Sequence, residues 1–120
     1  MSMSARQDDA TAATARVLAH HLAAFADGVP AILSDYAEHA VVITPDGVHR
    51  GPVQISGFFD AFLRGVSGAF WEAFRIDRQI VEGEVAYLVW SAPPFVAMAT
   101  DTLVVRDGRI VIQSFTSLSA

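Results

Sequence analysis

Hydrophobic positions near the start of the chain recur with the period of a helix. The apolar stripe of the first helix, which starts at about Ala10, consists of Leu18, Leu22 and Phe25. Asp27-Gly28 ends this helix, and Pro30 opens a short second helix that continues through Tyr36. The pattern therefore predicts two consecutive helices, one long and one short.

A third helix is predicted after the first strand. It starts at Pro52, which suits a first helical turn, and ends near Gly65 or Gly68. Its apolar face is formed by Ile55, Phe58, Phe59, Phe62 and Leu63. Such a face needs a partner layer to cover it.

The rest of the chain alternates with the period of a strand. The predicted strands are Ala40–Thr44, Glu72–Glu82, Val85–Ser91, Phe95–Arg106 and Arg109–Leu118. The turns between the last four contain Gly83, Pro93-Pro94 and Asp107-Gly108. Helices followed by a meander of long strands predict an α+β domain, with a curved sheet wrapped around the helices.

Alternation also divides each strand between the two faces of the sheet. Asp101, Leu103 and Val105 share one face of their strand, and in the preceding strand Tyr87 opposes Trp90. Both faces carry apolar residues, so one can cover the helices while the other needs a different cover. We therefore expect a homodimer through the sheet, with Trp90 at its interface.

Composition limits the class of protein. The chain has 120 residues, 52% of them hydrophobic, a net charge of −5 and no cysteine. This predicts one acidic domain over residues 10–120, after a flexible tail at 1–9, and no nucleic-acid partner. Disulfides and thiol nucleophiles are excluded. Without a signal sequence or an apolar run long enough for a bilayer, we expect a soluble cytoplasmic protein without membrane contact.

Asp101 stands out because it lies in an apolar strand with no basic residue close to it in the sequence. An unpaired buried carboxylate is costly, so it must reach water, find a partner or stay protonated. One interpretation places Asp101 at a pocket. The other makes it a strand-end residue that pairs with Arg75, with Arg78 or with solvent.

Two segments together resemble the NTF2-like superfamily, in its SnoaL-like and ketosteroid-isomerase-like branch. They are FADGVPAILSDYAEHAVVITPDGVHRGPVQISGFFDAF and, later, TDTLVVRDGRI. The resemblance covers roughly Ala10 to Leu118 and implies a cone-shaped α+β fold, in which three N-terminal helices pack in a strongly curved antiparallel sheet. It also implies a deep pocket and frequent dimerisation. It does not identify one activity, because the fold serves isomerases, cyclases, hydratases, epoxide hydrolases and non-catalytic binders.

The resemblance also implies roles for individual residues. Asp101 matches the acid that ketosteroid isomerases keep protonated in an apolar wall to donate a hydrogen bond to a substrate oxyanion. The tyrosine that shares this task in the isomerases aligns with His20, or with His21 after one gap, and the helical stripe favours His21. Tyr36 matches an aromatic position that borders the cavity.

At two positions the chain departs from the isomerase pattern, and both departures argue against ketosteroid isomerase activity. The position of the general base is occupied by Thr44, which cannot accept a carbon-bound proton at neutral pH. A pocket tyrosine on the third helix is replaced by Phe59, which has no hydroxyl. Genuine ketosteroid isomerase activity is therefore not expected.

The preferred hypothesis is an isomerase, cyclase or dehydratase that transfers a proton on a small hydrophobic carbonyl compound. Asp101 would be the acid or oxyanion donor and His21 the base, without metal or organic cofactor. The expected substrate-binding residues are Tyr36, Thr44, Phe59, Phe62, Tyr87, Val89 and Leu103.

Two other hypotheses remain open, namely a non-catalytic ligand-binding domain and a purely structural dimer module. For His21, the alternative to a substrate-facing role is a hydrogen-bonded core histidine. A metal site is not expected, because adjacent helix residues such as His20 and His21 point about 100° apart.

Overall fold

The computed structural model describes residues 3–119, with side chains from residue 5 onward. Its helices are α1 (Met3–Ala24), α2 (Val29–Leu33), α3 (Gly51–Gly65) and α4 (Gly68–Ala73). Its strands are β1 (Tyr36–Thr44), β2 (Gly47–Arg50), β3 (Arg75–Glu82), β4 (Val85–Ala92), β5 (Val96–Arg106) and β6 (Arg109–Ser119). The α+β class is confirmed.

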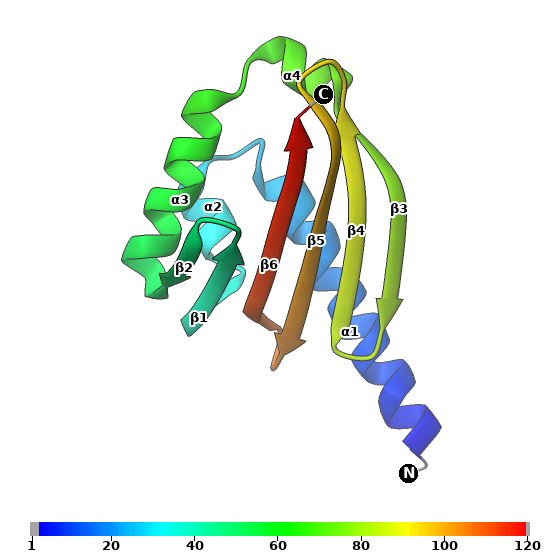
Figure 1. The fold of residues 1–120 in the computed structure, drawn as a ribbon. Helices are drawn as coiled ribbons and strands as arrows, with labels where there is room; N and C mark the ends of the chain where they lie inside the picture. Colours follow the sequence, from blue (N-terminus) through cyan, green and yellow to red (C-terminus); the bar gives the residue numbers. More distant parts are fainter. Residues whose placement is uncertain (1–2, 120) are drawn as a thin grey trace.

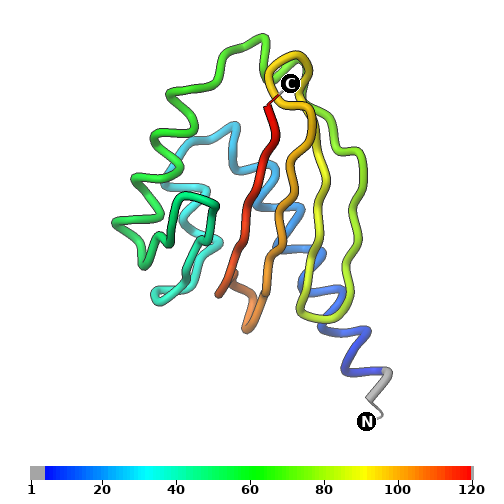
Figure 2. Tube along the Cα trace, in the orientation of Figure 1, coloured from blue at the N-terminus to red at the C-terminus, as the bar shows by residue number. Residues whose placement is uncertain are grey.

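The strands form one six-stranded sheet in the order β2-β1-β6-β5-β4-β3. All neighbours are antiparallel except β1 and β6, which are parallel. In Figure 1, α1 crosses behind β3 to β6, α3 lies beside the short β1-β2 pair, and α4 sits at the upper end of the long strands. The trace in Figure 2 shows β1-β2 turned away from the long strands. The helices thus cover one face of the sheet.

The first helix starts earlier than expected. The predicted tail over residues 1–9 is wrong for residues 3–9, which are helical, whereas residues 1 and 2 lie outside the described part of the chain. Further along α1, two threonines contact the turn between β3 and β4. Thr11 Oγ1 accepts from the amide of Gly83 at 2.8 Å, and Thr14 Oγ1 donates to the Gly83 carbonyl at 2.7 Å. These bonds dock the first half of α1 onto the sheet.

Other helices and strands also differ from those predicted, either in their bounds or because they were missed. The sequence analysis misses β2, which is completed only by pairing with β1. It also misses α4, which begins after Ser67, whose hydroxyl accepts from the amide of Phe70 as an N-cap. The strand expected from Glu72 therefore starts only at Arg75. Tyr36 begins β1 instead of ending a helix.

The hydrophobic core consists of two clusters. The larger joins α1, α2 and α3 to the inner face of the sheet and includes Leu18, Phe59 and Leu103. The smaller lies under α4 and includes Phe70, Leu88, Trp90, Ala92 and Ala99. Leu22 packs against both. The residues between the two clusters border the candidate site. Within residues 3–119, no helix is long and apolar enough to cross a membrane.

Thr14→Val tests the docking of α1. Thr14 is 1% exposed, so the valine would leave the Gly83 carbonyl without its donor. We expect a loss of about 1–3 kcal/mol in the free energy of unfolding, measured by urea denaturation. Thr116→Val, at an exposed position of β6, is the control and should change stability by less than about 0.5 kcal/mol. Equal effects of the two substitutions would contradict the docking of α1 through Thr14.

Candidate functional site

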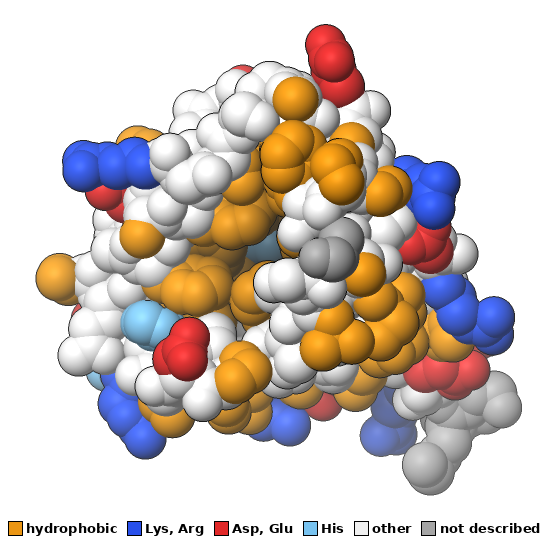
Figure 3. Space-filling model, turned by 45° about the horizontal axis from the view of Figure 1, so that its top comes forward, with side chains coloured by type: hydrophobic (Ala, Val, Ile, Leu, Met, Phe, Trp, Pro, Cys, Tyr) orange, Lys and Arg blue, Asp and Glu red, His pale blue; other side chains and the backbone are white. Residues whose placement is uncertain are grey.

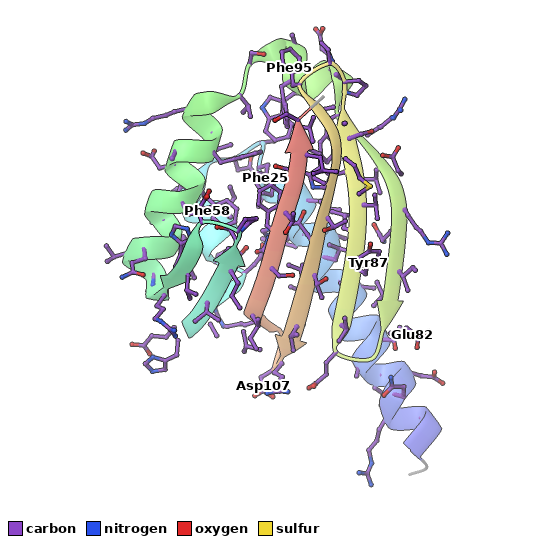
Figure 4. The ribbon with its side chains drawn as sticks, in the orientation of Figure 1. Phe25, Phe58, Glu82, Tyr87, Phe95 and Asp107 are labelled. Carbon is purple, nitrogen blue, oxygen red and sulfur yellow. The ribbon has the colours of Figure 1, made fainter. Side chains whose placement is uncertain are left out.

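An apolar cavity of about 90 Å³ lies between the inner face of the sheet and the helices. Its lining residues are Leu18, His21, Leu22, Phe25, Phe58, Phe59, Phe62, Trp71, Phe74, Leu88, Trp90, Asp101, Leu103, Gln113 and Phe115. Figure 3 shows a hollow in the surface that is surrounded by hydrophobic side chains and has a histidine side chain deep inside it. Phe25 and Phe58, labelled in Figure 4, lie between α3 and the sheet. Three polar residues stand among twelve apolar ones.

The carboxylate of Asp101 is held by two hydrogen bonds from neighbouring strands. Trp90 Nε1 donates to Oδ2 at 2.8 Å, and Gln113 Nε2 donates to Oδ1 at 2.8 Å. Asp101 pairs with Leu88 across β4 and β5, which places its side chain on the inner face. Arg75, suggested as a partner, instead contacts Asp77 and Ser91. Asp101 therefore stands at the cavity wall, held by uncharged donors.

Burial raises the pKa of Asp101, because the apolar surroundings disfavour its charged form. The hydrogen bonds from Trp90 and Gln113, and the charge of His21, lower this pKa and so oppose part of the rise. The result is a carboxyl group that holds its proton to a higher pH than an exposed aspartate. A carboxylic acid in such a state can donate a hydrogen bond into the cavity.

Tyr36 extends the hydrogen-bond chain behind the wall. Its hydroxyl donates to Gln113 Oε1, so Gln113 joins Tyr36 to Asp101. Burial raises the pKa of Tyr36 well above its ordinary value, and the negative charges of Asp101 and Asp35 raise it further. Tyr36 thus remains a neutral donor that orients Gln113.

His21 is the second titratable residue of the lining and is 4% exposed. Phe25, Tyr36 and Phe59 meet its ring edge-on, at centroid distances of 5.2, 5.7 and 6.1 Å. His20, by contrast, points outward with an exposed ring, as the helical stripe predicted. The charge of His21 affects the pKa of Asp101, so the two side chains lie close to each other. An imidazole and a carboxyl group therefore line the same apolar cavity.

A model of the SnoaL-like domain family matches residues 17–113, which is most of the chain. The chain belongs to the SnoaL-like domain family. The SnoaL-like part of the resemblance is thereby confirmed. No functionally curated protein matches this SnoaL-like domain.

Solved structures share the fold over nearly the whole chain. A candidate polyketide cyclase from Sinorhizobium meliloti is 20% identical, with a TM-score of 0.68 and 83% of this chain and 93% of that chain covered. An NTF2-like protein from Mesorhizobium loti is 20% identical, with a TM-score of 0.71 and coverage of 91% and 93%.

A de novo designed protein with a curved β-sheet is also similar. It is 12% identical, with a TM-score of 0.73 and 98% of this chain and 88% of that chain covered. At these identities the likeness establishes the shared fold alone.

The SnoaL-like domain brings some of the expected site residues together and separates others. Phe59, Phe62 and Leu103 line the cavity beside Asp101 and His21. Tyr36 lies behind the lining and reaches it through Gln113. Thr44 lies outside, in an open groove that shares only its phenylalanines with the cavity.

The expected positions of Tyr87 and Val89 in the pocket are wrong, and so is the expected position of Trp90 at a dimer interface. Leu88 is the cross-strand partner of Asp101, so the inner side chains of β4 are Leu88 and Trp90. Tyr87, labelled on β4 in Figure 4, alternates with them and points to the other face, as does Val89. The error arose because alternation shows which residues share a face but not which face is inside.

The sequence analysis misses two polar residues of the site. Gln113 interrupts the apolar run of β6 in the way that Asp101 interrupts β5, and this signal could have been read. Asp35 lies 3.7 Å from His21, but the two are brought together only by helix packing. Within the described residues, no group of three or more histidine and acidic side chains could hold a metal ion.

The raised pKa of Asp101 predicts a pH dependence of stability. The native state retains this proton to a higher pH than the unfolded chain, so the stabilisation is complete below about pH 4 and is lost as the pH rises through the native pKa. We expect the free energy of unfolding of the wild type, relative to Asp101→Asn, to fall as the pH rises. Urea denaturation of both proteins between about pH 4 and pH 8 measures this difference. A difference that rises with pH would contradict the assignment.

Proposed function

We propose that this SnoaL-like domain transfers a proton on a small hydrophobic carbonyl compound. The observation that carries the proposal is the pairing of Asp101 and His21 in one apolar cavity, one with a raised pKa and the other a buried imidazole. Two titratable groups with different environments in one pocket are typical of acid–base sites. The candidate polyketide cyclase with the same fold is compatible with carbonyl chemistry.

In the proposed step, the neutral imidazole of His21 takes a proton from the carbon next to the carbonyl. The electron pair of that C–H bond forms the carbon–carbon double bond of an enol. The carbonyl oxygen becomes negative and accepts a hydrogen bond, and then a proton, from the carboxyl group of Asp101. Trp90 and Gln113 support the carboxylate that this leaves on Asp101. The proton on His21 then returns to a carbon of the product, and the enol O–H proton returns to Asp101 as the carbonyl re-forms.

The size of the cavity limits the substrate. A cavity of about 90 Å³ is smaller than the about 150 Å³ of an apolar cavity known to hold benzene. The reacting part of the substrate is therefore a small ring or a short chain. Any remainder extends past Phe58, Phe62 and Phe115 into the outer groove, where Thr44, Asp46, His49 and Gln54 add polar groups. We infer a compound with an apolar carbonyl end and a polar end.

Deuterium exchange tests this function without knowledge of the natural substrate. A panel of small cyclic and linear ketones is incubated in D₂O with the protein, and loss of the α-proton signals is followed by ¹H NMR. We expect Asp101→Asn and His21→Gln each to lower the exchange rate by about 10²–10⁴-fold, the usual contribution of general acid–base catalysis. His39→Gln, which changes an exposed histidine of β1 outside the cavity and the outer groove, is the matched control and should keep the wild-type rate.

A non-catalytic ligand-binding domain is the second candidate. It is favoured by Thr44, whose hydroxyl accepts from the amide of Asp46 in the outer groove, and by the absence of a hydroxyl at Phe59. Ketones that bind without exchange, seen as NMR shifts at the cavity residues, would select this candidate. The lack of cysteine suits a reducing compartment, and we place either activity in the cytoplasm.

We also propose a homodimer through the outer face of the sheet. This face bears hydrophobic residues that are more than a third exposed, among them Ile43, Ile80, Val85, Ile112 and Leu118. Cross-strand pairs connect Ile80 to Tyr87, Tyr87 to Thr102, and Val104 to Ile112, which makes the surface continuous. An apolar surface of this kind is typical of an interface.

Ile112→Arg tests the dimer. We expect the wild type to sediment as a dimer at micromolar concentration and the variant as a monomer, because an arginine would have to be buried without a partner. Asp107→Arg, at the exposed β5-β6 turn, is the control and should remain dimeric. A wild type that sediments as a monomer would refute the proposal.

A further inference from the structure

Two buried polar atoms face each other outside the hydrogen bonds already described. Within residues 5–119, Nδ1 of His21 and Oδ2 of Asp35 are the only buried side-chain nitrogen or oxygen atoms without a hydrogen-bond partner. They lie 3.7 Å apart, and Asp35 is 7% exposed. Folded proteins leave few such atoms, because each one costs free energy. Their position next to the cavity indicates a role at the site.

The rest of Asp35 is fixed in place. Its Oδ1 lies 2.6 Å from Nδ1 of His20, whose side chain is 61% exposed and so approaches from the solvent side. Its carbonyl accepts from the amide of Ile110 on β6 at 2.7 Å, and its amide donates to Ile32 on α2. Only Oδ2 is therefore left for a partner on the inner side.

The surroundings of His21 offer Nδ1 no better acceptor. Phe25 and Phe59 meet the ring edge-on, and the hydroxyl of Tyr36 is engaged with Gln113. Hydrogen bonds at catalytic histidines are often long without a ligand and tighten in the reacting complex. Closing the 3.7 Å separation to an ordinary hydrogen bond needs a shift of only about 0.5–1 Å.

We propose that Asp35 is the positioning residue of His21. Its Oδ2 accepts the Nδ1 proton and thereby leaves Nε2 unprotonated as the nitrogen that serves the cavity. The carboxylate also stabilises the imidazolium formed when His21 takes a proton, whereas His20 holds the other oxygen in place. The assignment rests on the proposed function, because a positioned base has a purpose only where His21 acts as one.

The tautomer of His21 tests this assignment in the ligand-free protein. Long-range ¹H–¹⁵N NMR at about pH 8, where an ordinary histidine is neutral, distinguishes a protonated Nδ1 from a protonated Nε2. We expect the Nδ1–H form to exceed the other by about tenfold or more, as a hydrogen bond to a charged group provides. A wild-type spectrum with the proton on Nε2 would overturn the proposal, even if no variant folds.

Two substitutions of Asp35 separate positioning from a merely structural role. In Asp35→Leu the leucine side chain branches at Cγ as aspartate does but has no oxygen to accept the Nδ1 proton. We therefore expect His21 to shift to the Nε2–H tautomer in this variant. Asp35→Asn keeps one acceptor oxygen and should restore part of the Nδ1–H form. Asp46→Asn, at an exposed acid in the outer groove, is the control and should leave the tautomer unchanged. An unchanged tautomer in Asp35→Leu would also overturn the proposal.

The outcome is independent of the ketone experiment. Without detectable exchange, a dominant Nδ1–H form that depends on Asp35 preserves the positioning and rejects only the proposed chemistry. With exchange, we expect Asp35→Leu to lower the rate by about tenfold or more. An exchange rate that stays at the wild-type value would show that His21 acts without Asp35.

Discussion

The two hydrogen bonds that Trp90 and Gln113 donate to Asp101 are the constraint on which the site depends. A carboxyl group in an apolar wall is tolerated only if its oxygens are satisfied. Here both donors are uncharged, so they hold the group without forming an ion pair that would keep its pKa low. The fold can therefore keep an acid beside a cavity, with a raised pKa and its remaining lone pairs free.

The site is assembled from both layers of the fold. The sheet supplies Asp101, Trp90 and Gln113 from three adjacent strands, where cross-strand pairing sets their spacing. The helical side supplies His21 from α1 and Asp35 from the connection between α2 and β1. The acid is thus supported by the sheet and the imidazole by the helices. Docking of α1 through Thr14 and Gly83 joins the two supports.

Aromatic rings occupy most of the remaining lining and separate the cavity from the outer groove. Phe58, Phe62 and Phe115 belong to both spaces, so a ligand that fills both must pass between them. Under the proposed function, this arrangement would keep the reacting end of a ligand away from water, and electrostatic effects are stronger in such a dry site. A small inner cavity would then be compatible with a larger ligand.

Much of the fold and two of the candidate site residues follow from local patterns in the sequence. The helical stripe favoured His21 over His20, and the strand alternation placed Asp101 and Leu103 on one face, because both periods are properties of the backbone. The α+β class followed from the order of the elements. The start of α1 at Met3 did not follow from local patterns, and neither did the contact of Thr11 with Gly83, which is 72 positions away in the sequence.

Only the tertiary structure decided which face of β4 points inward, and hence that Trp90 and not Tyr87 lines the cavity. Strand period fixes alternation within one strand, but the inner face is set by register with β5 and by where the helices pack. The same reason hid Asp35, which meets His20 and His21 through helix packing across 15 and 14 positions of sequence. Local patterns therefore singled out Asp101 and favoured His21, the resemblance implied their roles as acid and base, and long-range packing determined the residues that hold them.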